Sequence, residues 1–207
     1  MNQHIETMKG ALYTYKKQRE AADERIAWIT ETYGKEAGEA ERNIQEKKTA
    51  QARAAAEKAI KDAGAAGLAA AEAWGRMDGS KLTDDVKLLD AGLVDKAEFD
   101  RLKGKYNGNA TMLAALRKYA DKQNAAAAEE ARKSGEGFAA AMTMPYDTRD
   151  MPTAEGKQNN WKKTQALALD LLDVMDGSGK YKDDWMGSFG RAALPEQMEH
   201  FGEGNDY

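Results

Sequence analysis

Proline is absent from the first 144 residues of this 207-residue chain, and its three prolines stand at Pro145, Pro152 and Pro195. Because proline removes a backbone donor and clashes with the preceding helical turn, a run this long without it can stay helical almost throughout. Alanine, glutamate, lysine, leucine and arginine make up 101 residues, a composition typical of long helices and coiled coils. The sequence therefore predicts a mostly α protein and excludes a β-rich fold.

Composition also limits the chemistry open to the chain. Leucine, isoleucine, valine and phenylalanine account for only 26 residues, and 38 alanines take their place as helix formers. The chain has no cysteine and two histidines, His4 and His200, so a thiolate nucleophile, a disulfide framework and a His/Cys zinc site are excluded. We expect no cofactor and no metal.

Charge divides the chain into three parts. Residues 1–76 and 77–134 each carry a net charge of +1, whereas residues 135–207 carry -6 and all three prolines. We expect a long amphipathic, alanine-rich helical region over 1–76 and a small module of capped helices over 77–134. The acidic region over 135–207, which holds half of the aromatic residues, is expected to form short helices and loops.

An apolar stripe runs along the N-terminal segment. Its members recur at alternating steps of three and four residues, which places them on one narrow helix face, as in a coiled-coil seam. We interpret eight of them as self-association residues: Ile5, Met8, Leu12, Tyr15, Ala22, Ile26, Ile29 and Tyr33. Arg19 lies within the stripe and favours imperfect or paired packing.

Two arrangements of this segment are compatible with the stripe. A single helix over residues 4–62 would be about 88 Å long, too long for a compact globule of this size. Alternatively, the chain folds back near Gly34–Gly38 or Gly64–Gly67 into an antiparallel hairpin. The stripe then packs either against another copy or inside an ordinary intramolecular bundle.

Helix-boundary residues punctuate the middle segment. Thr83, followed by two aspartates, predicts the start of a short helix that Gly92 ends. Asp95 with Glu98 predicts a capped helix to about Lys105. Asn109 predicts the cap of a helix over about 110–134.

The run from Lys87 to Tyr106, followed by the run from Asn109 to Ala120, resembles a helical pattern in small structural-module proteins of tailed phages and prophages. Those proteins are scaffolding-like or head-associated, and a long charged helix tends to precede the module, as it does here. The resemblance implies a structural role in virion assembly, in the cytoplasm of the host bacterium or in the virion. Together with the acidic C-terminal third of this chain, it favours a basic partner such as a capsid protein.

The last third combines acids with aromatic side chains. Asn160 predicts the cap of a helix from Trp161 to about Met175, with Asp170, Asp173 and Asp176 near its C-terminal end. The helix dipole disfavours acids there, which indicates solvent screening or a cationic partner. Four further residues are candidate anchors for a basic protein surface: Trp185, Phe189, Met198 and Phe201. Alternatively, these side chains pack back on the alanine-rich helices.

These observations favour a non-enzymatic structural or assembly protein that forms homo-oligomers through its N-terminal helix. The alternative is a monomeric helical-bundle adaptor or regulatory binding module, and an enzyme that uses carboxylates alone is a third hypothesis. Basic residues alternate with acids, so we expect no nucleic-acid binding. Residues 1–29 never run apolar for long, so we expect no membrane span and a cytoplasmic location.

Overall fold

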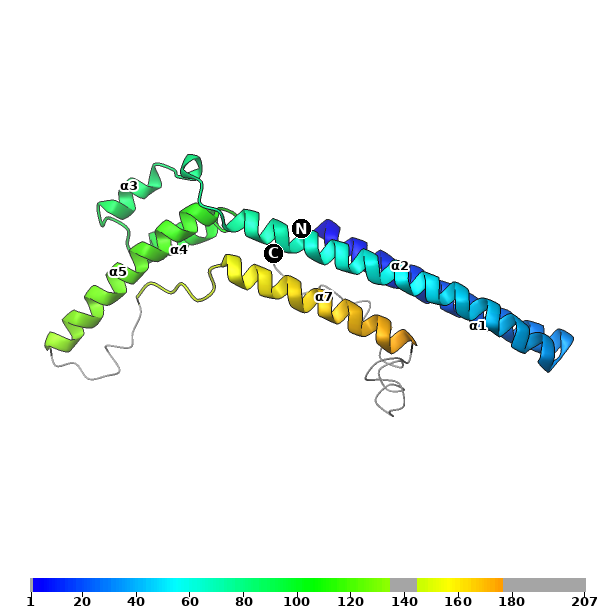
Figure 1. Ribbon diagram of the computed structural model, residues 1–207. Helices are drawn as coiled ribbons and strands as arrows, with labels where there is room; N and C mark the ends of the chain where they lie inside the picture. The colour runs from blue at the N-terminus through cyan, green and yellow to red at the C-terminus, as the bar shows by residue number, and fades with distance from the viewer. Residues whose placement is uncertain (1, 135–144, 177–207) are drawn as a thin grey trace. The chain divides into compact units, whose positions relative to one another are not determined.

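The computed structural model describes residues 2–134 and 145–176. They form the helices α1 (Asn2–Tyr33), α2 (Lys35–Gly75), α3 (Asp85–Asp90), α4 (Lys96–Lys105), α5 (Ala110–Ser134) and α7 (Ala154–Asp176), with a 3₁₀ turn, η1 (Gly79–Lys81) (Figure 1). These ranges contain no β-strand, which confirms the predicted mostly α fold.

The chain divides into two compact units. Among the described residues, unit 1 consists of 2–70 and 158–176, and unit 2 consists of 71–134 and 145–157. This division differs from the predicted 1–76, 77–134 and 135–207, because most of α7 packs with the N-terminal helices rather than within a separate C-terminal region. The charge change near residue 135 therefore does not mark a boundary between the units.

A sharp turn at Gly34 makes α1 and α2 a helical hairpin. Gly34 has a φ of 90°, a left-handed conformation that glycine adopts without strain, and its N–H donates to the Thr30 carbonyl at 3.0 Å. At Gly38 a Cβ would overlap the Thr30 side chain, so only glycine allows the helices to approach so closely. Arg25 and Glu41 pair across the hairpin at 3.4 Å. The hairpin predicted at Gly34–Gly38 is present, and the single long helix is not.

Helix α7 is the third helix of unit 1. Trp161 is fully buried against Gly67, where a Cβ would overlap its indole ring, and it makes an edge-to-face contact with His4 at 5.9 Å. Further along, Gln165 donates to the Lys61 carbonyl at 3.4 Å. From Trp161 to the end of α7, the residues contacted on α1 rise in number, from His4 to Tyr15 and Arg19. Those contacted on α2 fall, from Gly67 to Lys61. Helix α7 therefore runs parallel to α1 and antiparallel to α2.

Unit 2 has a conventional apolar core. Its buried residues come from α3, α4, α5 and their connections: Leu89, Val94, Phe99, Leu102, Tyr106, Met112, Leu113, Leu116, Tyr119, Ala120 and Met151. The predicted caps are confirmed at two helices, since Asp95 accepts from the Glu98 N–H at 2.8 Å and Asn109 accepts from the Met112 N–H at 3.2 Å.

Two predicted helix starts are wrong. The N-cap of α3 is Asp84, which makes no capping bond with its side chain, and Thr83 instead hydrogen-bonds the Tyr106 hydroxyl at 2.7 Å. Helix α7 begins at Ala154, before the predicted cap at Asn160. The Thr153 hydroxyl accepts from the Gly156 N–H at 2.8 Å, which is the local capping interaction there.

Candidate functional site

A cluster of charged side chains joins the end of α7 to the hairpin. Asp176 accepts hydrogen bonds from the Tyr15 hydroxyl and from Arg19, and Arg53 pairs with Asp173. The Arg53 Nε also lies 2.9 Å from an Asp176 oxygen. Two guanidinium groups thus face two carboxylates, and their formal charges cancel.

Tyr15 is the buried member of this cluster, with 1% of its surface exposed. Burial, together with the hydrogen bond to Asp176, raises the pKa of Tyr15 to about 12, because both disfavour the phenolate. The phenol therefore remains a hydrogen-bond donor across the physiological pH range. This arrangement holds the end of α7 against α1.

The cluster accounts for two sequence anomalies. Arg19 interrupts the apolar stripe, and the three aspartates stand at the helix end where the dipole disfavours them. Two of these aspartates meet Arg19 and Arg53 of the same chain, so the cationic partner indicated by the sequence is intramolecular at Asp173 and Asp176.

The stripe residues divide into two groups in the structure. Five are buried in unit 1, namely Ile5, Met8, Leu12, Tyr15 and Ala22. Ile26 and Ile29 are half-buried, and Tyr33 is 65% exposed. The five buried residues pack within one chain, as in the intramolecular alternative. Self-association stays a prediction, and in this fold it would need a surface to which those five side chains expose little area.

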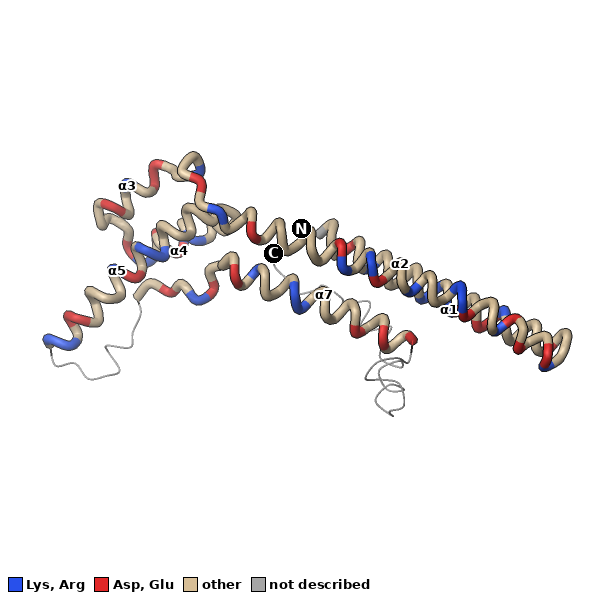
Figure 2. Tube along the Cα trace, in the orientation of Figure 1, with Lys and Arg blue, Asp and Glu red and all other residues tan. Residues whose placement is uncertain are grey.

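A second surface of the hairpin is open. A groove of about 1200 Å³ runs between α1 and α2, lined by residues from Thr7 to Arg25 and from Glu41 to Ala59. We call it the open groove. Seven of its nineteen lining residues are alanine, and only Arg25, Glu41 and Lys48 carry a charge. Across unit 1, acidic and basic residues alternate along the hairpin (Figure 2).

Large apolar side chains are exposed at the turn end of this face. Ile44 lines the open groove and is 50% exposed. Trp28 is 47% exposed; Arg25 stacks on its ring at 4.8 Å, and Tyr33 meets it edge-to-face at 5.8 Å. Aromatic residues beside arginine are typical of protein interfaces.

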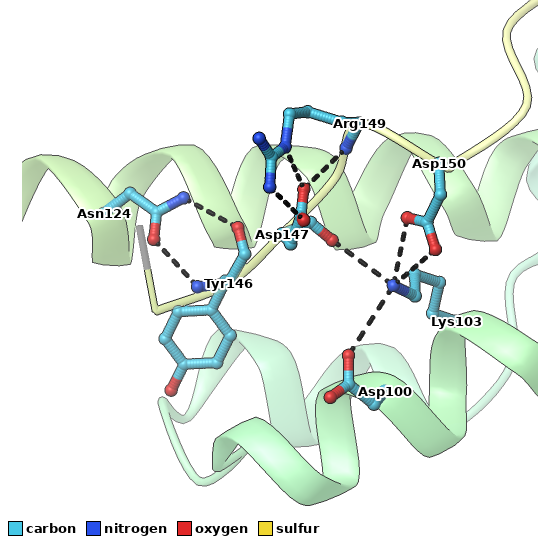
Figure 3. Close-up of polar contacts among 7 residues, drawn as sticks. All are labelled: Asp100, Lys103, Asn124, Tyr146, Asp147, Arg149 and Asp150. Carbon is cyan, nitrogen blue, oxygen red and sulfur yellow. Dashed lines mark hydrogen bonds and ion pairs between the residues drawn. The ribbon is translucent and has the colours of Figure 1, made fainter. Parts of the chain in front are cut away.

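In unit 2, polar contacts fasten the segment before α7 to the helical core (Figure 3). The Lys103 ammonium donates to both Asp150 oxygens at 2.9 and 3.0 Å and lies 3.6 Å from Asp100. The bond to Asp150 raises the pKa of Lys103. The Tyr146 N–H donates to the Asn124 side chain at 3.0 Å. These contacts hold residues 145–151 against α4 and α5, and this structural role explains them.

The remaining predicted site residues, Trp185, Phe189, Met198 and Phe201, lie outside the described residues. Within the described ranges, no group of three or more acidic or histidine side chains is placed to hold a metal ion. None of the helices described there combines the length and apolarity that crossing a membrane requires.

Comparison of the chain with protein-family models, with curated proteins and with solved structures found no match. The candidate site therefore rests on geometry alone. The open groove was not predicted from the sequence, because its alanines are equally typical of solvent-exposed helix. One usable signal was Gly10, which occupies a helix interior although no atom of the described chain lies within 4 Å of where its Cβ would be.

Proposed function

We propose that this chain is a structural or assembly protein that associates with further copies of itself through the face of the hairpin that bears the open groove. The observation that carries the proposal is the open groove, which is bordered by exposed Trp28 and contains exposed Ile44. Alanine lining lets another helix approach closely, and the few charges leave little to desolvate.

The size of this face supports a stable contact. From Thr7 to Tyr33, α1 extends about 39 Å at 1.5 Å per residue, and two helices of about 10 Å diameter make the face about 20 Å wide. Two such faces would cover about 1,560 Å² in total, within the range of specific protein interfaces. A phage or prophage assembly role, in the host cytoplasm or the virion, is the setting that the resemblance over about 82–120 favours.

Light scattering after size-exclusion chromatography tests the proposal. The monomer mass is 22.7 kDa, and we expect the measured mass to rise toward twice that value or more as the concentration increases. A mass that stays at 22.7 kDa at high concentration would refute self-association.

The second candidate function is a monomeric helical-bundle adaptor. The burial of Ile5, Met8, Leu12 and Tyr15 within the chain favours it, because a bundle of three helices already satisfies most of the apolar stripe. In that case the same face would bind another protein. A basic partner such as a capsid protein is proposed for the acidic C-terminal region. Removal of residues 177–207, which retains α7 in unit 1, should abolish co-purification with it.

A further inference from the structure

We infer that the open groove is a two-fold interface in which a second copy lies with its hairpin turn at the same end as that of the first. The inference rests on the proposed function and adds the partner's orientation. It commits to one occupant, a second copy of this chain, and it follows from where the three charges of the groove lie along the hairpin.

The hairpin places its lining residues in levels. Arg25 of α1 is level with Glu41 of α2, and the two pair at 3.4 Å. Because the helices are antiparallel, each step toward the N-terminus of α1 matches a step toward the C-terminus of α2. Gln18 is therefore level with Lys48, and Thr7 with Ala59, all of which line the groove.

Two face-to-face arrangements have two-fold symmetry. When the turns lie together, α1 of one copy covers α2 of the other at the same level. Arg25 of each copy then faces Glu41 of its partner, which gives an alternating square of four charges. Lys48 faces the neutral amide side chain of Gln18.

When the turns lie at opposite ends, each level meets the level at the other end of the groove. Arg25 and Glu41 then lie against Thr7 and Ala59, so these charges lose water without gaining a partner. Desolvating an ion pair that gains no further partner is costly, whereas complementary charges across an interface fix its register. The charges of the groove therefore favour the arrangement with the turns together.

A charge exchange distinguishes the two arrangements. In the double variant Arg25→Glu/Glu41→Arg the pair within each chain is restored, and the alternating square is restored between two variant chains. We expect this variant to dimerise with a dissociation constant within about threefold of the wild type. In a mixed dimer with the wild type, like charges would face each other at both positions.

Native mass spectrometry of an equimolar mixture measures the outcome. We expect mixed dimers at least about tenfold below the statistical proportion, since opposed like charges across an interface cost several kcal/mol. A statistical proportion of mixed dimers would overturn the inference while leaving self-association intact. A monomer at every concentration would overturn both, and would leave the face to another protein or to another part of this chain.

A matched pair of substitutions locates the interface. Ala55 and Ala54 are adjacent and exposed, but only Ala55 lines the open groove. We expect Ala55→Arg to weaken dimerisation at least tenfold and Ala54→Arg to leave it within twofold of the wild type, with unchanged helix content in both. Equal effects of the two substitutions would place the interface elsewhere and overturn the inference.

Discussion

The close packing of α7 on α2 at Gly67 allows a sharp test of unit 1. An alanine in a helix interior is about 1 kcal/mol more favourable than glycine. At Gly67, however, the added Cβ would overlap the ring of Trp161, which is fully buried. Overpacking of this kind costs about 1–3 kcal/mol. We therefore expect Gly67→Ala to lower the free energy of unfolding, by up to about 2 kcal/mol.

Gly10 provides the matched control, because it lies inside α1 and no described atom comes within 4 Å of its would-be Cβ. Gly10→Ala should raise the free energy of unfolding by about 1 kcal/mol. Because Gly10 also lines the open groove, both variants are compared at a protein concentration at which the chain is monomeric. Urea unfolding followed by circular dichroism at the helical band measures them. If Gly67→Ala were as stabilising as Gly10→Ala, then Trp161 would not pack on α2 and the three-helix arrangement of unit 1 would be wrong.

Three further predictions concern polar contacts. The folded-state pKa of Tyr15 is about 12, above the unfolded value of about 10, so its stabilising contribution is complete below pH 10 and is lost between pH 10 and 12. We expect alkaline unfolding titrations to show a loss of about 3 kcal/mol there that Tyr15→Phe largely removes; an unchanged profile in the variant would contradict this. Arg53→Met leaves Asp173 and Asp176 with one guanidinium fewer and should cost about 1 kcal/mol, since these groups are part-exposed. This loss, measured by urea unfolding, should shrink in 1 M salt. Asp95→Ala removes the cap of α4 and should destabilise unit 2 by about 1 kcal/mol in thermal unfolding, whereas Asp95→Asn should cost less.

The elements that the sequence predicted well depend on local interactions. Asp95 and Asn109 cap helices through backbone groups three residues away, and Gly92, with a φ of 71°, ends α3 where a left-handed residue is required. Such signals need no knowledge of the rest of the fold. The prediction at Thr83 was wrong because it considered local partners alone, whereas the Thr83 side chain hydrogen-bonds the distant Tyr106 hydroxyl.

The return of α7 to the hairpin could not be predicted in the same way. The pairing of Trp161 with Gly67, or of Asp176 with Arg19, joins residues separated by the whole of unit 2. The sequence contained both halves of the second pairing as anomalies, a cation in an apolar stripe and acids at a helix end. Each anomaly is costly alone, and the two costs offset each other only when the segments meet. Pairing such anomalies by opposite charge is a physical criterion that would have predicted the packing of α7 on the hairpin.

The open groove shows why the stripe alone left the oligomeric state undecided. A heptad stripe fixes which side of α1 is apolar, but it does not fix how many helices share that side. In unit 1 the stripe is buried as far as Ala22; beyond it, Ile26 and Ile29 are half-buried and Tyr33 is exposed. The alanines that line the open groove lie beside this stripe, and Ala21 and Ala55 among them are exposed. A search for self-association should therefore begin with the small residues that flank the stripe, because their exposure shows which face the intramolecular bundle leaves uncovered.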